Sequence, residues 1–417
     1  MRIAHLADLH FGNKADKLEE VVITTSFALN WLTNYPPDLI VLAGDSVDEA
    51  DGPIRIDSDA ARAAISFVSA CSQLAPVVIV RGTPSHDRRT PELFRALKGR
   101  YPIHVATEIE MVALAGARKE DLHFIPYSEL PASLTFVNAI LTFLPSPDKA
   151  HVVASFGGTS RQLTTLAANE CLHDALAYIG EVNSQVPPGI PKILVGHGMI
   201  TGARYSSGTI ATGADLEFSV HDLNLTNTDV KLFGHIHAHQ IFPGNIIYSG
   251  SPGRLNFGET EEKGFVMATI NTAGNDGIEF IKTPAREFLF RDMEWDEEGA
   301  AKILDEAQQV TLLCQGKDVR FRYNIPEEMR HAVDRNSLQE QFITAGARVA
   351  KVEMTVIPVV RQRAAGISRK LTLTEKIQAW AQVTNTDIPA RVMTIAATIE
   401  GETIDELLQS AGFEINA

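Results

Sequence analysis

The sequence contains little cysteine and no long hydrophobic run. Its three cysteines, Cys71, Cys171 and Cys314, are scattered over 417 residues without the spacing of a metal-binding motif. Such thiols are typical of core residues in a reducing compartment and argue against a disulfide framework. No apolar stretch approaches the ~20 residues that a membrane-spanning helix needs, so we expect no membrane-spanning segment. The N-terminus lacks the pattern of a secretory signal, and we therefore expect a cytoplasmic protein.

Basic residues are also outnumbered. Lysine and arginine total 37 against 52 aspartates and glutamates, which gives a formal net charge of −15. A protein that binds nucleic acid through its phosphates usually has a basic face. Binding of DNA by this chain would therefore depend on local basic clusters, on bound metal ions or on a partner chain.

The first two thirds of the chain alternate short apolar strands with amphipathic helices. Helices are expected at residues 17–32, at 59–74 with Asp59 as the cap, from Pro91 onward, and at 165–182. Three strands joined by Gly, Asn and Asp turns follow His239. This alternation predicts a layered α/β domain over residues 1–285.

The remaining residues predict two smaller parts. Strands and helices are expected to alternate at 288–295, 297–310, 319–323, 327–345 and 349–357. This βαβαβ order predicts a small α+β domain over residues 286–360. The last part, residues 361–417, begins with a polar linker at 361–369 and continues with helices at 373–383, 389–399 and 403–410. These helices are too few to form a core, so we expect them to dock on another surface.

Histidine and aspartate clusters stand at the ends of five apolar runs. The clusters are Asp8-Leu9-His10, Gly44-Asp45, Ser85-His86-Asp87, Gly196-His197 and Gly234-His235-Ile236-His237. Because buried strands deliver their last side chains to one rim of a sheet, we expect these groups to converge. Convergent imidazoles and carboxylates predict a two-metal hydrolytic site.

The candidate ligands divide between two metal ions. We expect Asp45 to bridge both ions, with Asp8, His10 and His237 on the first and His197 and His235 on the second. Mixed histidine and carboxylate ligands favour Mn²⁺, Fe or Zn²⁺ over Mg²⁺ or Ca²⁺. His86 would then be free to stabilise the transition state or to protonate the leaving oxygen.

In this order, the clusters resemble the calcineurin-like metallophosphoesterase superfamily. Within it, the chain is similar to SbcD-type DNA repair exonuclease subunits and their phage recombination nuclease relatives. The motifs that extend the likeness are His197-Gly198-Met199-Ile200, Leu232-Phe233-Gly234-His235-Ile236-His237, Tyr248-Ser249-Gly250-Ser251-Pro252, Leu255-Asn256-Phe257-Gly258-Glu259 and Lys263-Gly264-Phe265. The resemblance implies an α/β/β/α sandwich, a small α+β capping domain and a C-terminal helical segment.

The resemblance also implies an activity and partners. It points to a nuclease with two divalent ions, Mn²⁺ by preference, that acts on double-stranded DNA as an exonuclease and on single-stranded DNA as an endonuclease. His86 and Asp87 would be catalytic, and the partners would be DNA, an SbcC-type coiled-coil ATPase and a second copy of the chain, with dimer contacts in residues 61–97. The alternatives are a stand-alone metallophosphatase or cyclic-nucleotide phosphodiesterase, and a scaffold without catalysis.

One loop departs from the family pattern. The family usually has Gly-Asn-His-Asp, in which the asparagine binds the second metal, whereas this chain has Gly82-Thr83-Pro84-Ser85-His86-Asp87. Ser85 stands at the asparagine's position when residues are counted back from His86. We therefore expect Ser85, or a backbone carbonyl of the longer loop, to bind a more weakly held second metal.

Overall fold

The structure is a computed structural model that describes residues 1–50, 52–146, 161–205, 209, 217–271, 277–358 and 372–401. The linker expected at residues 361–369 and the helix expected at 403–410 lie outside the described residues. Among the helices of the described part, none combines the length and the apolar character that crossing a membrane requires.

A six-stranded sheet contains the first strands of the chain. Its order is β17-β16-β1-β3-β5-β6, with bounds Gly277–Lys282, Gly264–Thr269, Arg2–Leu6, Leu39–Ala43, Val77–Val80 and Ile103–Ala106. The four strands β1, β3, β5 and β6 run parallel, and β16 and β17 are antiparallel additions. The carboxyl ends of the parallel strands therefore meet at one edge of this sheet.

A second, seven-stranded sheet has the same character at its centre. Its order is β14-β15-β13-β10-β9-β7-β8, with bounds Gln240–Phe242, Ile246–Tyr248, Val230–Gly234, Lys192–His197, Val137–Leu144, Glu110–Ala115 and His123–Pro126. Strands β15, β13, β10 and β9 are parallel, and the others are antiparallel to their neighbours. Short parallel pairs join β2 (Phe11–Gly12) to β4 (Val47–Asp48) and β11 (Met199–Ile200) to β12 (Glu217–Phe218).

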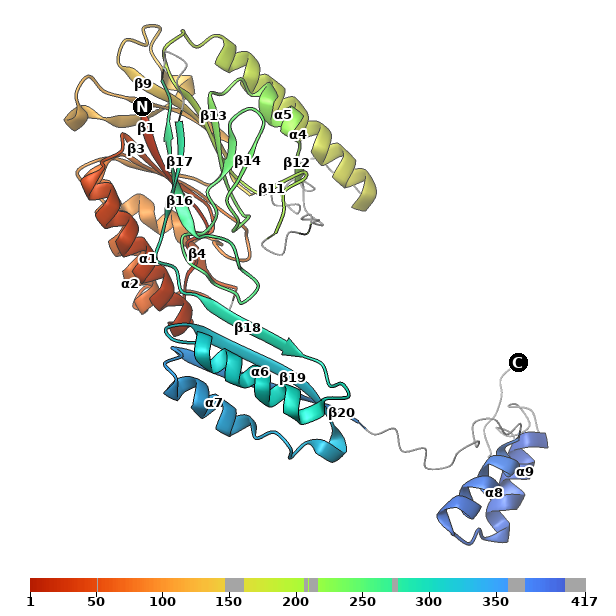
Figure 1. The fold of residues 1–417 in the computed structure, drawn as a ribbon. Helices are drawn as coiled ribbons and strands as arrows, with labels where there is room; N and C mark the ends of the chain where they lie inside the picture. The colour runs from red at the N-terminus through yellow and green to blue at the C-terminus, as the bar shows by residue number, and fades with distance from the viewer. Residues whose placement is uncertain are drawn as a thin grey trace. The chain divides into compact units, whose positions relative to one another are not determined.

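Helices cover the outer face of each sheet, and the two inner faces pack together (Figure 1). Helices α1 (Ala15–Asn34) and α2 (Asp59–Leu74) lie on the first sheet, and α4 (Arg161–Ser184) and α5 (Val220–Leu225) lie on the second. Successive side chains of β3 point to opposite faces of the first sheet and pack in two different hydrophobic cores. Val41 faces the second sheet, whereas Ile40 and Leu42 face α1 and α2. The predicted α/β/β/α sandwich is thus confirmed.

Two local predictions about helices are corrected. Ser58, not Asp59, caps α2, since the Ser58 side chain accepts a hydrogen bond from the backbone N–H of Ala61 at 3.1 Å. The segment after Pro91 forms a 3₁₀ helix, η1 (Thr90–Ala96), with proline in its first turn. Two further 3₁₀ turns are η2 (Lys119–Asp121) and η3 (Tyr127–Glu129).

The C-terminal third contains a separate small sheet and four helices. The sheet has the order β18-β19-β20, with bounds Phe288–Met293, Asp318–Pro326 and Val349–Ile357. The helices are α6 (Gly299–Leu313), α7 (Arg335–Thr344), α8 (Leu373–Thr384) and α9 (Ala390–Gly401). The single helix expected at 327–345 was wrong. A 3₁₀ turn, η4 (Glu327–Met329), precedes Asp334, whose carboxylate accepts from the N–H groups of Asn336 and Ser337 and so starts α7.

The described chain falls into two compact units. The first comprises Met1–Arg291, Gln309–Arg320 and Gln339–Lys351, and the second comprises Asp292–Gln308, Phe321–Leu338 and the described residues of Val352–Ala417. The domain boundaries expected from the sequence, after residues 285 and 360, remain a prediction.

Replacing the buried Glu20 by alanine tests how α1 is tied to the rest of the first unit. The Glu20 carboxylate accepts from the backbone N–H groups of Arg254 at 2.8 Å and Arg286 at 3.0 Å. Its loss leaves two donors without partners, so we expect Glu20→Ala to lower the free energy of unfolding by about 3 kcal/mol in urea denaturation. The neighbouring Glu19, whose side chain is 61% exposed, pairs with Arg348. Glu19→Ala should cost about 1 kcal/mol or less, and equal losses would contradict this role of Glu20.

Candidate metal centre

The metal centre lies where parallel strands of both sheets end. Asp8 follows β1, Asp45 follows β3, His197 ends β10 and His235 follows β13. In the register of the second sheet, His197 lies opposite Gly234, the residue before His235. Backbone hydrogen bonds join the turns of the first sheet, and one of them runs from the N–H of Asp8 to the carbonyl of Gly44 at 3.1 Å. The two sheets thus deliver their carboxyl-end side chains to a common place.

The predicted ligands lie in two groups, and Asp45 lies with the candidate ligands of the second ion. Asp8, His10 and His237 form one group, and Asp45, His197 and His235 form the other. Within each group the ligand atoms lie within 4.8 Å of one another. The Nε2 atoms of His10 and His237 are 3.2 Å apart, and His197 Nε2 lies 3.3 Å from Asp45 Oδ2.

The hydrogen bonds around the imidazoles fit bound cations. His197 donates its Nδ1 hydrogen to the carbonyl of Ala43 at 2.8 Å, which leaves Nε2 facing Asp45. His10 Nδ1 is buried and has no hydrogen-bond partner among the described residues. Buried lone pairs that face one another repel unless a proton or a cation lies between them. This donor set, rich in imidazole, suits Mn²⁺, Fe or Zn²⁺.

Four of these residues have backbone conformations that side chains rarely adopt. The φ angles are 53° at Asp8, 54° at His10, 47° at Asp45 and 107° at His235. Left-handed conformations at non-glycine residues cost on the order of 1–3 kcal/mol each. Such strain persists only where the surrounding structure holds it, and it concentrates here at the residues that carry the ligands.

The carboxylates and imidazoles of the two clusters shift one another's pKa values. Burial alone would raise the pKa of Asp45, but the imidazole of His197 holds it well below its usual range. Burial would lower the pKa of His197, yet the carboxylates of Asp45 and Asp8 raise it to about 9. Burial, helped by His237, lowers the pKa of His10 to about 3 and keeps that ring neutral. A metal ion in the second cluster must therefore compete with a proton at His197.

His86 lies beside the first cluster and has its own carboxylate partner. Its ring is 4.8 Å from that of His10, and its Nδ1 donates to Asp48 Oδ1 at 2.9 Å. This hydrogen bond raises the pKa of His86, although burial opposes it. His10, Asp48 and His86 also bring their potential ligand atoms within 4.8 Å. Asp48, which the Gly44-Asp45-x-x-Asp48 spacing could have identified, thus orients a candidate acid.

The structure gives Asp87 a different role from the predicted catalytic one. Its side chain is fully buried and accepts from the backbone N–H of Val47 at 3.0 Å and of Gly82 at 2.6 Å. Both oxygens are directed at the backbone, and neither belongs to a described metal cluster. Asp87 is therefore a positioning residue that ties the His86 loop to the strand after Asp45.

Thr83, not Ser85, lies against the second cluster. Ser85 is exposed, whereas Thr83 Oγ1 lies 3.2 Å from both Asp45 Oδ2 and His197 Nε2. The backbone N–H of Thr83 also donates to Asp45 Oδ1 at 2.6 Å. Counting back from His86 failed because the loop turns at Pro84: the N–H groups of His86 and Asp87 both bond to the carbonyl of Thr83.

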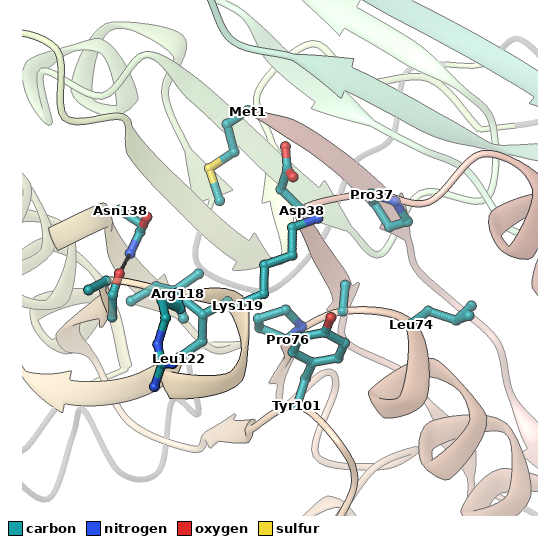
Figure 2. Close-up of a pocket in the computed structure, with 14 residues that line it drawn as sticks. Met1, Pro37, Asp38, Leu74, Pro76, Tyr101, Arg118, Lys119, Leu122 and Asn138 are labelled. Atoms are coloured by element: carbon teal, nitrogen blue, oxygen red, sulfur yellow. Dashed lines mark hydrogen bonds between the residues drawn. The ribbon is translucent and has the colours of Figure 1, made fainter. Parts of the chain in front are cut away.

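A pocket of about 270 Å³ lies at the opposite edge of the sheets (Figure 2). Asp38 precedes β3, Pro76 precedes β5, and Met1 precedes β1, so the pocket is at the edge where the parallel strands begin. Lys119 and Asn138 also line it. It contains none of the predicted site residues and is separate from the metal centre.

Comparison with known proteins identifies the class of the molecule. Residues 1–239 match the calcineurin-like phosphoesterase family, and the chain belongs to it. The chain is similar to a solved dimetal phosphatase from Danio rerio, with 10% identity, coverage of 68% of this chain and 96% of that chain, and a TM-score of 0.36. A search of curated proteins found no match. The protein is thus a metallophosphoesterase, a hydrolase with candidate ligands for two metal ions.

Thr83→Val tests which residue of the rebuilt loop serves the second cluster. The variant keeps the side-chain shape and the backbone bond to Asp45 but removes the hydroxyl. We expect it to weaken one of two Mn²⁺ sites on the order of tenfold in calorimetric titration. Ser85→Ala is the matched control and should leave both affinities unchanged. Weakening by Ser85→Ala alone would restore Ser85 as the ligand.

Proposed function

We propose that the protein is a metal-dependent DNA nuclease, an exonuclease on double-stranded DNA and an endonuclease on single-stranded DNA. Phosphodiester hydrolysis is supported by the two clusters of candidate ligands and by His86, whose ring lies 4.8 Å from that of His10. The choice of DNA rests on the resemblance of residues 248–265 to SbcD-type nucleases and on the elements that follow residue 285.

The side chains divide the work between metal binding and proton transfer. Asp8, His10 and His237 would hold one ion and His197 and His235 the other, with Asp45 shared. Bound divalent ions, Mn²⁺ in this proposal, lower the pKa of a water molecule and neutralise charge on a phosphoryl group. Asp8, His10, Asp45 and His197 are buried, and His235 and His237 are partly buried.

His86 is the proposed general acid. Asp48 holds its Nδ1 hydrogen, which leaves Nε2 to donate a proton to the leaving oxygen of the ester. The raised pKa keeps the ring protonated at a higher pH than an ordinary histidine. Positioned acids of this kind contribute roughly 10²–10⁴-fold to a rate.

The exposed surface of the C-terminal helices supports the proposal of a protein partner. Helices α8 and α9 expose these apolar side chains: Leu373, Trp380, Val383, Val392, Ile395 and Ile399. Such a surface favours docking of an SbcC-type coiled-coil ATPase. That partner would also provide DNA affinity that a chain of net charge −15 lacks. A homodimer through residues 61–97 belongs to the same proposal.

Degradation of labelled linear duplex and single-stranded DNA with Mn²⁺ tests the activity. The wild-type protein should degrade both. His86→Ala should lower the rate about 10²–10⁴-fold with metal still bound, whereas His237→Ala should also lose metal affinity. His123→Ala, at an exposed histidine outside the clusters, is the control with unchanged rate. Intact DNA together with rapid hydrolysis of a cyclic nucleotide or an aryl phosphate would replace the nuclease by the alternative enzymes. Bound metal without turnover of either would favour a scaffold.

The pH dependence of kcat tests the pairing of Asp48 with His86. Because His86 acts in its protonated form, activity should fall as the pH rises through its raised pKa. Asp48→Asn removes the charge that raises this pKa, so the alkaline limb should move to lower pH. Asp57→Asn, at a side chain that is 65% exposed, should leave the limb in place. An unmoved limb in Asp48→Asn would contradict the assigned pairing.

A further inference from the structure

A buried lysine lies directly behind the first metal cluster. The side chain of Lys263 is 0% exposed. Its Nζ donates to Glu259 Oε2 at 2.9 Å, to Ser251 Oγ at 3.0 Å and to Glu261 Oε1 at 2.5 Å, and it lies 3.3 Å from the carbonyl oxygen of His237. A buried ammonium needs such a shell, because burial without partners is costly. The lysine is therefore held in one place.

Glu259 connects this lysine to the cluster. Its Oε1 accepts from His237 Nδ1 at 2.9 Å and from Asn256 Nδ2 at 3.2 Å. Its Oε2 accepts from the backbone N–H of Leu255 at 2.9 Å as well as from Lys263. Four donors thus converge on a carboxylate that is 5% exposed, and they leave it a single orientation.

The orientation of Glu259 determines which nitrogen of His237 faces the cluster. A carboxylate only accepts hydrogen bonds, so Nδ1 of neutral His237 must carry the hydrogen. The lone pair is then on Nε2, which lies 3.2 Å from His10 Nε2 within the group that includes Asp8. The negative charge of Glu259 also makes the imidazole a stronger electron donor.

We infer that Glu259, held in place by Lys263, is the positioning residue of the first metal site and sets its affinity through His237. The inference rests on the proposed two-metal function but concerns binding alone. It assigns a role to Glu259 and Lys263, which lie four positions apart in the sequence and outside the ligand clusters.

Mn²⁺ titration of the full chain, by calorimetry and by electron paramagnetic resonance, tests the inference without a substrate. Glu259→Gln keeps the side-chain size and removes the charge. We expect one Mn²⁺ site to weaken 10–100-fold while the other is unchanged. Glu261→Gln is the matched control, because Glu261 bonds to the same Lys263 Nζ, whereas the carboxylate that bonds to His237 Nδ1 is that of Glu259. It should leave both sites unchanged.

The outcomes separate this inference from the proposed function. Unchanged affinity in Glu259→Gln, or equal weakening of both sites, overturns the inference. A wild-type protein that binds no metal overturns the proposed function itself. Nitrogen NMR of the zinc-loaded wild-type protein needs no variant: His237 should carry its hydrogen on Nδ1, and a hydrogen on Nε2 would overturn the inference even if Glu259→Gln fails to fold.

Discussion

The close approach of strand ends from two sheets is the constraint on which the metal centre depends. A Cβ atom at Gly44 would overlap the imidazole of His197, and one at Gly234 would overlap the carbonyl oxygen of Ala43. Gly44 also has a φ of +83°, which glycine adopts without strain. Because the ligands come from both sheets, side chains at these two positions would force the clusters apart. Four candidate ligands at these strand ends have positive φ angles. The strain of these backbone conformations is offset by the packed cores on either side of the sheet.

Fixed acceptors behind the imidazoles are the second feature of the centre. The pairs are His197 with the Ala43 carbonyl, His237 with Glu259 and His86 with Asp48. Each acceptor holds the hydrogen on Nδ1 and directs Nε2 away from itself. In the proposed function the same arrangement would serve two tasks: two rings would present lone pairs for metal binding, and the third would present a proton. The acceptors differ in charge: the carbonyl behind His197 is neutral, whereas Glu259 and Asp48 are carboxylates.

The sequence predicted most of the sandwich, but it placed the rebuilt loop wrongly. The division of the candidate ligands between two ions, with Asp45 as the bridge, stays a prediction. Apolar runs precede Asp8, His10, His197 and the other candidate ligands. Such runs predict strands whose ends share an edge. The loop from Gly82 to Asp87 contains no such apolar run. Its course depends on a turn at Pro84 and on the buried Asp87, which accepts backbone hydrogen bonds from the distant Val47 and from Gly82 at the start of the loop. Position counted along the chain therefore could not identify Thr83 as the residue beside Asp45.

The chemistry of the candidate ligands and the strands that carry them follow from the local sequence. Apolar runs and the residues at their ends are local properties, and they do not change when the chain folds. Tertiary structure alone decided which acceptor stands behind each ring, because those contacts join residues far apart, such as Ala43 and His197. It also decided the partners of Glu259 and the orientation of Thr83. Hydrogen-bond direction at a buried site depends on every neighbour at once, and those neighbours meet only in the folded chain.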